Sequence, residues 1–350
     1  VDVINVEEAR SDIRSTTRTG YSTFDSQPGI QTLLDTAGPN KTLLFPPNGL
    51  FDLNGKDLTT KSTYQCLAST GEARLINGGI KLASHWSRLK NLILSGASSY
   101  WIDVQAFKCS ASGMTIQDKT VAGINYTTYL GSHFSLLESH IQYCTGKGFY
   151  ANVNDSALDY GDVFFNNVTI TGCTGVAAHL VKLGGFNFTG SKIQNNTGGG
   201  LLFETTASNI GQLWGHYIGN SSFEDNGTYD LRVNSTGGSY IPTRIMIEGG
   251  TIHKLSLLVG TQIYMHGVLV PISAVHDSGC TYVFASGCPE YMALVTGSGT
   301  SYMMVDINSA NGAIIKVGGG FKISDNTGSG RVGPTITSIS ATPSFIGQTA

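Results

Sequence analysis

The chain has 350 residues, of which 45 are Gly, 13% are charged and 40% are hydrophobic, and its net charge is −3. So much Gly with so little charge excludes a long helix or coiled coil, whereas the apolar share, with 15 Tyr and 15 Phe, excludes a disordered chain. The nearly balanced charge gives no sign of a nucleic-acid surface. These properties predict a large, turn-rich, mostly β fold.

The first segment, residues 1–53, is expected to hold a capping helix and the first strands. Gln27–Ala37 carries Ile30, Leu33 and Leu34 at helical spacing, which favours an amphipathic helix. Residues 43–53 (LLFPPNGLFDL) are then predicted as a strand, a turn and a strand. No apolar run approaches the ~18 residues of a membrane span, and residues 1–10 do not resemble a secretory signal.

Residues 54–260 contain an internal repeat. Stretches such as CTGKGFYANV and CTGVAAHLVK align without gaps on an anchor residue, found at positions 97, 119, 144, 173, 196 and 226. Apolar residues recur eight and three positions before each anchor, and five and seven positions after it. Alternating apolar residues with a period of 22 to 30 residues are typical of a parallel β-solenoid, in which each coil pairs with the next at ~4.8 Å.

A β-sandwich also has short strands and Gly-rich turns, but its hairpins give no reason for a gapless register at steady spacing. In the solenoid, the glycines two residues after the anchor, Gly146, Gly175 and Gly198, are expected to serve a turn that requires positive φ. The register fades after about Lys254. Residues 261–330 are predicted to form a distinct C-terminal β region, which is a possible trimerisation region, and residues 331–350 an extended tail.

With a helix, a strand ending in FPPNG and Gly/Asn-rich coils, residues 25–330 resemble the right-handed parallel β-helix of pectate-lyase-like proteins, and among them bacteriophage tailspikes. The tail ATPSFIGQTA is similar to segments near the ends of phage tail proteins. The resemblance implies a single-stranded right-handed parallel β-helix in a homotrimer that binds, and commonly cleaves, a bacterial surface polysaccharide. It also implies a virion or extracellular location, with a secreted bacterial protein as the alternative. The GDG turn that often precedes the cap helix in relatives is missing here.

The register also indicates which side chains face outward. The column six positions after the anchor contains Tyr150, His179 and Arg232, and Glu204 stands eight positions after its own anchor. The two longest coils carry insertions at one corner, 154–162 and 206–216. Loops on a rigid scaffold favour function, so we expect substrate to contact Tyr150, His179, Trp214, His216, Tyr217 and Arg232.

Glycoside hydrolysis needs two carboxyl groups ~5–9.5 Å apart. The best catalytic candidates are Asp155, Asp159 and Glu204, unless a second subunit supplies the partner acid. A polysaccharide lyase on the same scaffold is the alternative, since His179 and Arg232 offer a base and a group that neutralises a uronate. A non-catalytic adhesion spike is a further alternative, since it would need only the columns of outward-facing polar and aromatic side chains.

No metal is expected, because the acids are few and scattered. No cofactor is expected either, and the charge and the apolar runs described above give no sign of nucleic-acid binding or membrane insertion. Cys144 and Cys173 share the anchor position in adjacent coils, where they would stack as thiols or could form a disulfide. Cys280 and Cys288 could pair if oxidised. The identity of the polysaccharide and the host cannot be read from the sequence.

Overall fold

The computed structural model describes residues 2–13, 25–96, 99–118, 121–126, 133–152, 161–205, 215–235, 243–257 and 261–270, and the backbone of the strands between residues 273 and 345. The chain divides into two compact units, Val1–Ala178 and His179–Ala350. The described part consists mostly of parallel β-strands, with only two helices, α1 (Val6–Ala9) and α2 (Gln27–Thr36). Ladders of parallel strands with so little helix are consistent with a parallel β-helix.

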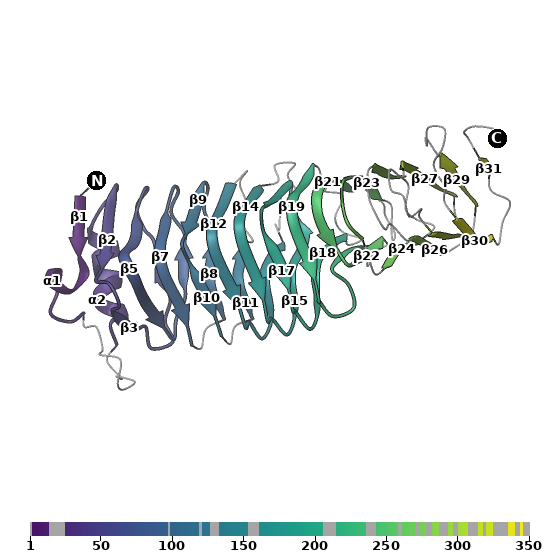
Figure 1. Cartoon of the computed structure of the whole chain (residues 1–350). Coiled ribbons are helices and arrows are strands. Elements are labelled where there is room, and N and C mark those ends of the chain that lie inside the picture. The colour runs from purple at the N-terminus through teal and green to yellow at the C-terminus, as the bar shows by residue number, and fades with distance from the viewer. Residues whose placement is uncertain are drawn as a thin grey trace. The chain divides into compact units, whose positions relative to one another are not determined.

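In the first unit, parallel strands form two ladders, drawn as arrows in Figure 1. Ladder A consists of β1 (Asp2–Asn5), β2 (Lys41–Phe45), β3 (Leu50–Asp52), β5 (Cys66–Ile76), β7 (Arg88–Ser95), β9 (Cys109–Ser112), β10 (Thr115–Gln117), β12 (His133–Gln142) and β14 (Asp162–Thr171). Ladder B consists of β4 (Leu58–Thr59), β6 (Ile80–Leu82), β8 (Tyr100–Val104), β11 (Ala122–Tyr126) and β13 (Lys147–Asn152).

The second unit repeats this organisation, and strand β15 (Val176–Lys182) spans the boundary. Its ladder A consists of β16 (Gly185–Thr189), β17 (Lys192–Gln194), β19 (His216–Glu224), β21 (Thr243–Ile252), β23 (Thr261–His266), β25 (Tyr282–Ser286), β27 (Thr300–Asp306), β29 (Gly320–Ser324) and β31 (Ser344–Phe345). Its ladder B consists of β18 (Gly199–Thr205), β20 (Leu231–Ser235), β22 (Lys254–Leu257), β24 (Ser273–Asp277), β26 (Ala293–Thr296), β28 (Ile314–Val317) and β30 (Thr335–Ile339). Parallel pairing therefore continues past Lys254, where the sequence register fades.

The register predicted from the repeat is the register of the strand pairs. In the first unit, Ile116 pairs with Ile141 and Ile141 with Ile170, three positions before their anchors. In the second unit, Leu201 pairs with Leu231, five positions after the anchors. These residues have no exposed surface, so like apolar side chains stack on one another inside the coils.

The first strand of ladder B, β4, has one edge that no other described strand pairs with. Helix α2 occupies this edge with side-chain amides. Gln31 accepts a hydrogen bond from the Thr59 amide at 2.8 Å and donates one to the Thr59 carbonyl at 3.0 Å. Gln27 donates to the carbonyl of Asp57 at 2.9 Å. The helix thus satisfies backbone groups that a bare strand edge would leave open.

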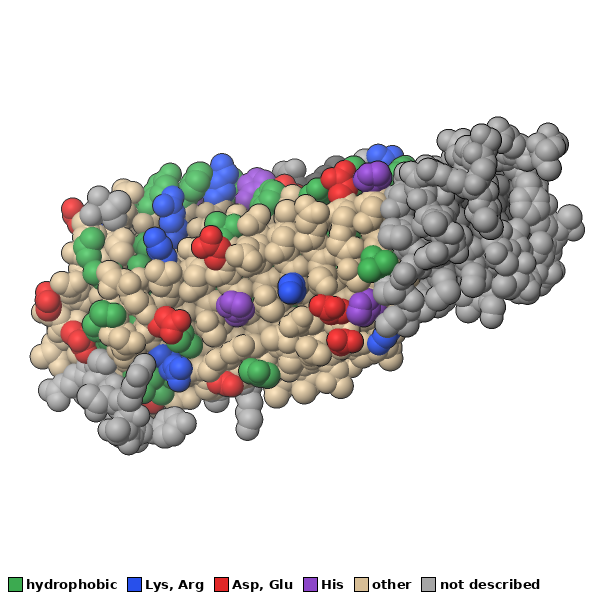
Figure 2. All heavy atoms as spheres, viewed as in Figure 1, with side chains coloured by type: hydrophobic (Ala, Val, Ile, Leu, Met, Phe, Trp, Pro, Cys, Tyr) green, Lys and Arg blue, Asp and Glu red, His purple; other side chains and the backbone are tan. Residues whose placement is uncertain are grey.

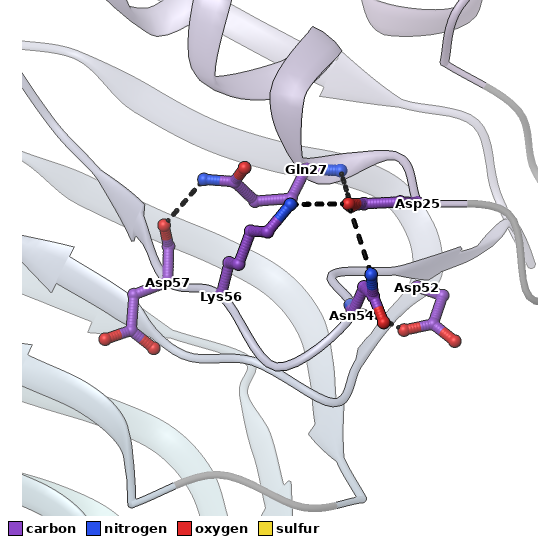
Figure 3. A network of polar contacts seen from close by, with 6 residues as sticks. All are labelled: Asp25, Gln27, Asp52, Asn54, Lys56 and Asp57. Carbon is purple, nitrogen blue, oxygen red and sulfur yellow. Dashed lines mark hydrogen bonds and ion pairs between the residues drawn. The ribbon is translucent and has the colours of Figure 1, made fainter.

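Asp25 fixes the start of α2, as Figure 3 shows. Its carboxylate accepts hydrogen bonds from the Gln27 amide at 3.1 Å, from Lys56 at 2.7 Å and from Asn54 at 3.3 Å. Burial alone would raise the pKa of Asp25, but the bonds from Lys56 and Asn54 outweigh it and lower that pKa. The helix start is therefore tied to the turn between β3 and β4.

Two corners of the coils are made by residues in the left-handed backbone region. One lies six positions before each anchor, within or between ladder A strands, and is occupied by Asn91, Gly113, Glu138, Asn167, Gly190 and Asn220. The pairing of β19 with β21 adds Gly249 to the same column. The other lies one position before each anchor, at Gly96, Asp118, Tyr143, Gly172, Asn195 and Asp225. Asn, Asp and Gly adopt this conformation at least cost.

The expectation that Gly146 and Gly175 need positive φ is wrong, since the left-handed residue stands three positions earlier. Both glycines are instead required by the close stacking of neighbouring turns. A Cβ on Gly146 would lie 1.8 Å from the carbonyl oxygen of Val121, and a Cβ on Gly175 would lie 2.4 Å from that of Gly146. These turns therefore exclude any side chain.

The anchor column itself is buried. Cys144 and Cys173 are fully buried and are not joined in a disulfide, and the hydrogen bond between their side chains, together with burial, raises the pKa of the Cys173 thiol. In the second unit Asn196 and Asn226 take this place, with Asn196 Nδ2 donating to Asn226 Oδ1 at 2.8 Å. Asn226 in turn donates to the buried Asp230 at 2.6 Å. Cys280 and Cys288 lie outside the described residues.

Candidate functional site

The candidate site lies on the outward face of ladder B in the second unit, over strands β15, β18 and β20. The pairing of β18 with β20 places Leu202 beside Arg232 and Glu204 beside Asn234. Four polar side chains gather here: His179, Glu204, Tyr229 and Arg232. We call them the ladder B cluster.

His179 and Glu204 form a direct contact within the cluster. His179 Nε2 lies 2.7 Å from Glu204 Oε2, and the two side chains are only 12% and 17% exposed. The sequence register places the two backbones ~8 Å apart, one coil and two residues removed. Their side chains are long enough to close this distance, so the imidazole holds one oxygen of the carboxylate in place.

Tyr229 and Arg232 form the other half of the cluster. The Arg232 guanidinium carbon lies 4.3 Å from the centre of the Tyr229 ring, as in a cation–π pair. The ring is 4% exposed and lies against the preceding coil at Gly199, where a Cβ would come within 2.5 Å of the ring. A larger residue at Gly199 would displace the ring.

The electrostatics of Tyr229 connect the two halves. Burial raises the pKa of Tyr229 to about 12; the Arg232 charge lowers this pKa and the Glu204 charge raises it. The Tyr229 hydroxyl therefore remains protonated at neutral pH. Arg232 makes no ion pair with any described residue, and its buried Nε has no hydrogen-bond partner there. The cluster thus offers a carboxylate, a protonated phenol and an arginine available to an anion.

Groups of this kind can move a proton next to a bound anion. The carboxylate can accept a proton, the phenol can donate one, and the guanidinium can bind a carboxylate in two-point geometry. Hydrolysis by two carboxyl groups is less well supported, because Asp230, an acid on the next coil, is completely buried and accepts a hydrogen bond from the buried Asn226. Asp155 and Asp159 lie outside the described residues.

The remaining predicted residues lie in several places. Tyr150 belongs to the first unit, where Lys147 Nζ lies 4.0 Å from its ring centre and Asn152 donates to its hydroxyl at 3.1 Å. Trp214 lies outside the described residues. Tyr217 stands on ladder A and donates to Glu248 at 2.8 Å, which raises the pKa of Tyr217. Tyr217 therefore lies on a different ladder from the ladder B cluster.

His216 lies in the interior instead of on a loop. It is 1% exposed, begins strand β19, and accepts a hydrogen bond at Nδ1 from the Phe186 amide at 3.1 Å. Its ring centre is 4.6 Å from that of Phe203, and burial lowers the pKa of His216 to about 3. A residue in this place cannot reach a ligand outside the coil, so we remove it from the proposed site.

Sequence reasoning missed Tyr229. Strict alternation puts it on the same side as Leu231 and Val233, facing inward. The structure breaks this alternation, because Asp230 and Leu231 are consecutive and both fully buried. The fully buried Trp101, at the same position of its coil as Asp230, breaks the alternation in the same way. Because two consecutive residues are buried, Tyr229 lies on the same face of the strand as Arg232.

The described residues contain no group of three or more His, Cys, Asp or Glu side chains arranged to hold a metal ion. None of the described helices is both long enough and apolar enough to span a membrane.

Comparison with known proteins shows the fold. No family model and no curated protein sequence matches the chain. The A-module of the Azotobacter vinelandii mannuronan C-5 epimerase AlgE4 matches in structure over 100% of both chains, with 14% identity and a TM-score of 0.59.

Two further structures match with lower TM-scores. The catalytic unit of an α-1,3-glucanase of family GH87 from Streptomyces thermodiastaticus shares 14% identity over 99% of this chain and 69% of its own, with a TM-score of 0.45. Tailspike protein 3 of bacteriophage CBA120 shares 8% identity over 96% and 60%, with a TM-score of 0.41. Of the three matches, the first supports a common fold.

Proposed function

We propose that this chain is a β-helix protein that binds an acidic bacterial surface polysaccharide and cleaves it by elimination at the ladder B cluster. The observation that carries the proposal is the pairing of Arg232, which has no ion-pair partner among the described residues, with the buried Tyr229 beside Glu204. The fold shared with a protein named for its action on mannuronan supports an acidic substrate.

In the proposed reaction, Arg232 binds the carboxylate of a uronate unit. Glu204, held by His179, takes the proton from the carbon next to that carboxylate. The carbon–oxygen bond to the neighbouring sugar breaks, a carbon–carbon double bond forms, and the Tyr229 hydroxyl supplies the proton to the departing oxygen. The raised pKa of Tyr229 keeps that proton available at neutral pH.

Hydrolysis is the second candidate, and Glu204 is the observation that favours it, because this carboxylate is partly exposed within the cluster. It would act with Asp155 or Asp159. A non-catalytic adhesion spike is the third candidate, and in that case the cluster would bind without cleaving.

We further propose a homotrimeric phage tailspike with right-handed coils, capped at its start by α2 and located outside the cell on the virion. The resemblance of the sequence to tailspikes supports this assignment, and the hydrogen bonds between α2 and the edge of β4 support the cap.

The test is incubation of the full chain with purified capsule or O-antigen. Unsaturated uronate ends, detected by their ultraviolet absorbance, would support elimination; new reducing ends without that absorbance would mean hydrolysis; binding without cleavage would mean an adhesin. Glu204→Gln should lower the cleavage rate about a hundredfold or more while sparing binding.

Glu224→Gln is the matched control. Glu224 also faces a histidine, with 3.9 Å between its Oε2 and His253 Nε2, but on ladder A of the same unit. This variant should cleave like the wild type, and equal loss in both variants would exclude the ladder B cluster as the site.

A further inference from the structure

A stripe of large side chains crosses the first unit at one corner, where the strands of ladder A begin. Cys66, Arg88, Ser110 and Ser135 are paired in register along β5, β7, β9 and β12. Two residues before each of them stand Tyr64, Trp86, Lys108 and His133. We call these four, together with Phe107 and Phe164, the corner stripe.

The rings of the corner stripe contact one another from coil to coil. Tyr64 and Trp86 stack with ring centres 5.3 Å apart and planes 17° apart. Trp86 and Phe107, Phe107 and His133, and His133 and Phe164 follow at 6.3, 6.2 and 6.0 Å. Lys108 Nζ lies 4.6 Å from the Trp86 ring centre and 4.9 Å from that of Phe107. The stripe therefore crosses five successive coils as one aromatic and cationic surface.

The backbone of the corner stripe is strained. Tyr64, Trp86 and Lys108 have φ values of 61°, 63° and 53°, in the left-handed region. Bulky residues rarely adopt this conformation, and the other two left-handed corners of the coils hold mainly Asn, Asp and Gly. Strain retained at equivalent positions of successive coils points to a use for these side chains, because packing alone would be served by Asn or Gly.

Positive charge surrounds the corner stripe. Arg88 and Lys90 are exposed on β7, and they partly offset the rise that burial causes in the pKa of the Cys66 thiol. The acid that contacts the stripe in the described structure is Asp162, 3.5 Å from His133. Figure 2 shows hydrophobic, Lys or Arg, and His side chains gathered along the upper edge of the first unit, above the starts of its ladder A strands.

The ring geometry agrees with this charge. Because Tyr64 and Trp86 turn their faces toward each other, their edges are left for a ligand, and the edge of an aromatic ring is its electropositive part. Successive coils present these edges ~4.8 Å apart, about the length of one sugar unit in an extended chain. The surface therefore fits a long ligand that has both oxygen-rich and negatively charged groups.

We propose that the corner stripe is a second binding surface for an acidic polysaccharide, which would lie along it from Tyr64 to Phe164. The proposal concerns binding by the first unit, and it takes only the class of ligand from the proposed function. Cleavage at the ladder B cluster is not required for it.

The test measures binding of the full chain to polygalacturonate, with dextran as the neutral polymer, by isothermal titration calorimetry. A triple variant, Tyr64→Asn, Trp86→Asn and Lys108→Asn, keeps a residue type that accepts the left-handed backbone. Glu204→Gln in every protein prevents cleavage during the titration. The triple variant should bind polygalacturonate about tenfold more weakly or worse, and added salt should weaken binding by the parent.

Tyr143→Asn is the matched control. Tyr143 also has a left-handed backbone, with φ 57°, and is 60% exposed, but it follows the far end of β12. Its variant should bind as the parent does. Equal binding by the triple variant, equal loss in the control, equal binding of dextran, or no binding of polygalacturonate would each overturn the proposal.

Light scattering on the same proteins tests the rival occupant, a second copy of this chain. A triple variant that loses an oligomeric state of the parent would show that the corner stripe joins copies, and this would overturn the proposal. If the wild type cleaves no polysaccharide but the stripe variants still lose binding, only the proposed function fails.

Discussion

Glu204 Oε2 lies 2.7 Å from His179 Nε2, on neighbouring strands of ladder B in the second unit. This contact restricts the carboxylate to one orientation, with its second oxygen left for a substrate. His179 is thus a positioning residue for Glu204, and the two should be separable by kinetics.

We expect His179→Ala to lower kcat by up to about a hundredfold, because the carboxylate loses its fixed orientation. KM should change little, since the substrate is bound mainly by Arg232. Steady-state kinetics on the cleaved polysaccharide measures both constants, with His253→Ala as the control on ladder A. A rise in KM at unchanged kcat would instead assign His179 to binding.

Arg232 should determine the preference for an acidic substrate. Arg232→Ala removes a charge-assisted contact of about 1.5–3 kcal/mol, which corresponds to about a ten- to hundredfold loss in kcat/KM. Arg232→Lys should recover part of this loss, because it restores the charge without the planar fork. If both variants keep wild-type kcat/KM, the uronate carboxylate is not bound here.

His216 should make the fold sensitive to acid. Its pKa in the folded protein, about 3, lies below the ~6.5 of an unfolded chain, so the unfolded state binds the extra proton between these values. Stability should therefore fall as the pH drops from ~6.5 toward 3, by up to about 1.4 kcal/mol per pH unit, and be unaffected by His216 above ~6.5.

The measurement is the free energy of unfolding as a function of pH for the wild type and His216→Gln. The variant should be less stable at neutral pH, because the hydrogen bond from the Phe186 amide is altered, but its stability should change less between pH 6.5 and 4. Parallel pH curves for the two proteins would contradict the assignment of this transition to His216.

Gly146→Ala should destabilise the first unit strongly. The new Cβ would lie 1.8 Å from the Val121 carbonyl oxygen, and that oxygen belongs to backbone that cannot move without separating two coils. Overpacking of this kind costs about 1–3 kcal/mol or more. Gly55→Ala is the control, since a Cβ there meets nothing within 4 Å and only its φ of 76° is unfavourable. Thermal unfolding should rank Gly146→Ala as the more damaging change.

The apolar columns could be predicted from sequence because every coil must fill the same interior. Ile141 and Ile170 recur at one offset from their anchors, and the strand pairs have this offset. The corner six positions before the anchor was not predicted, because its residues, such as Asn91, Gly113, Asn167 and Gly190, share a left-handed backbone and not a hydrophobic side chain.

The ladder B cluster could be predicted only in part. His179, Glu204 and Arg232 follow from the outward columns, but Tyr229 depends on the local loss of alternation at Asp230. The contact between His179 and Glu204 depends on side-chain reach across two strands, which the repeat does not encode. The corner stripe was overlooked for a related reason, since Tyr64, Trp86 and Lys108 precede the strands whose pattern defines the register.

The pairing of each strand with its equivalent in the next coil has a consequence for how such a chain can change in length. Thr115 pairs with His140, so excision of residues 115–139 would join Met114 to the residue that already occupies the same place one coil later. The columns above and below would meet with like residues facing one another. The length of the protein can thus change in steps of one whole coil. A shortened first unit that still folds would set how many coils a bound polysaccharide can cross.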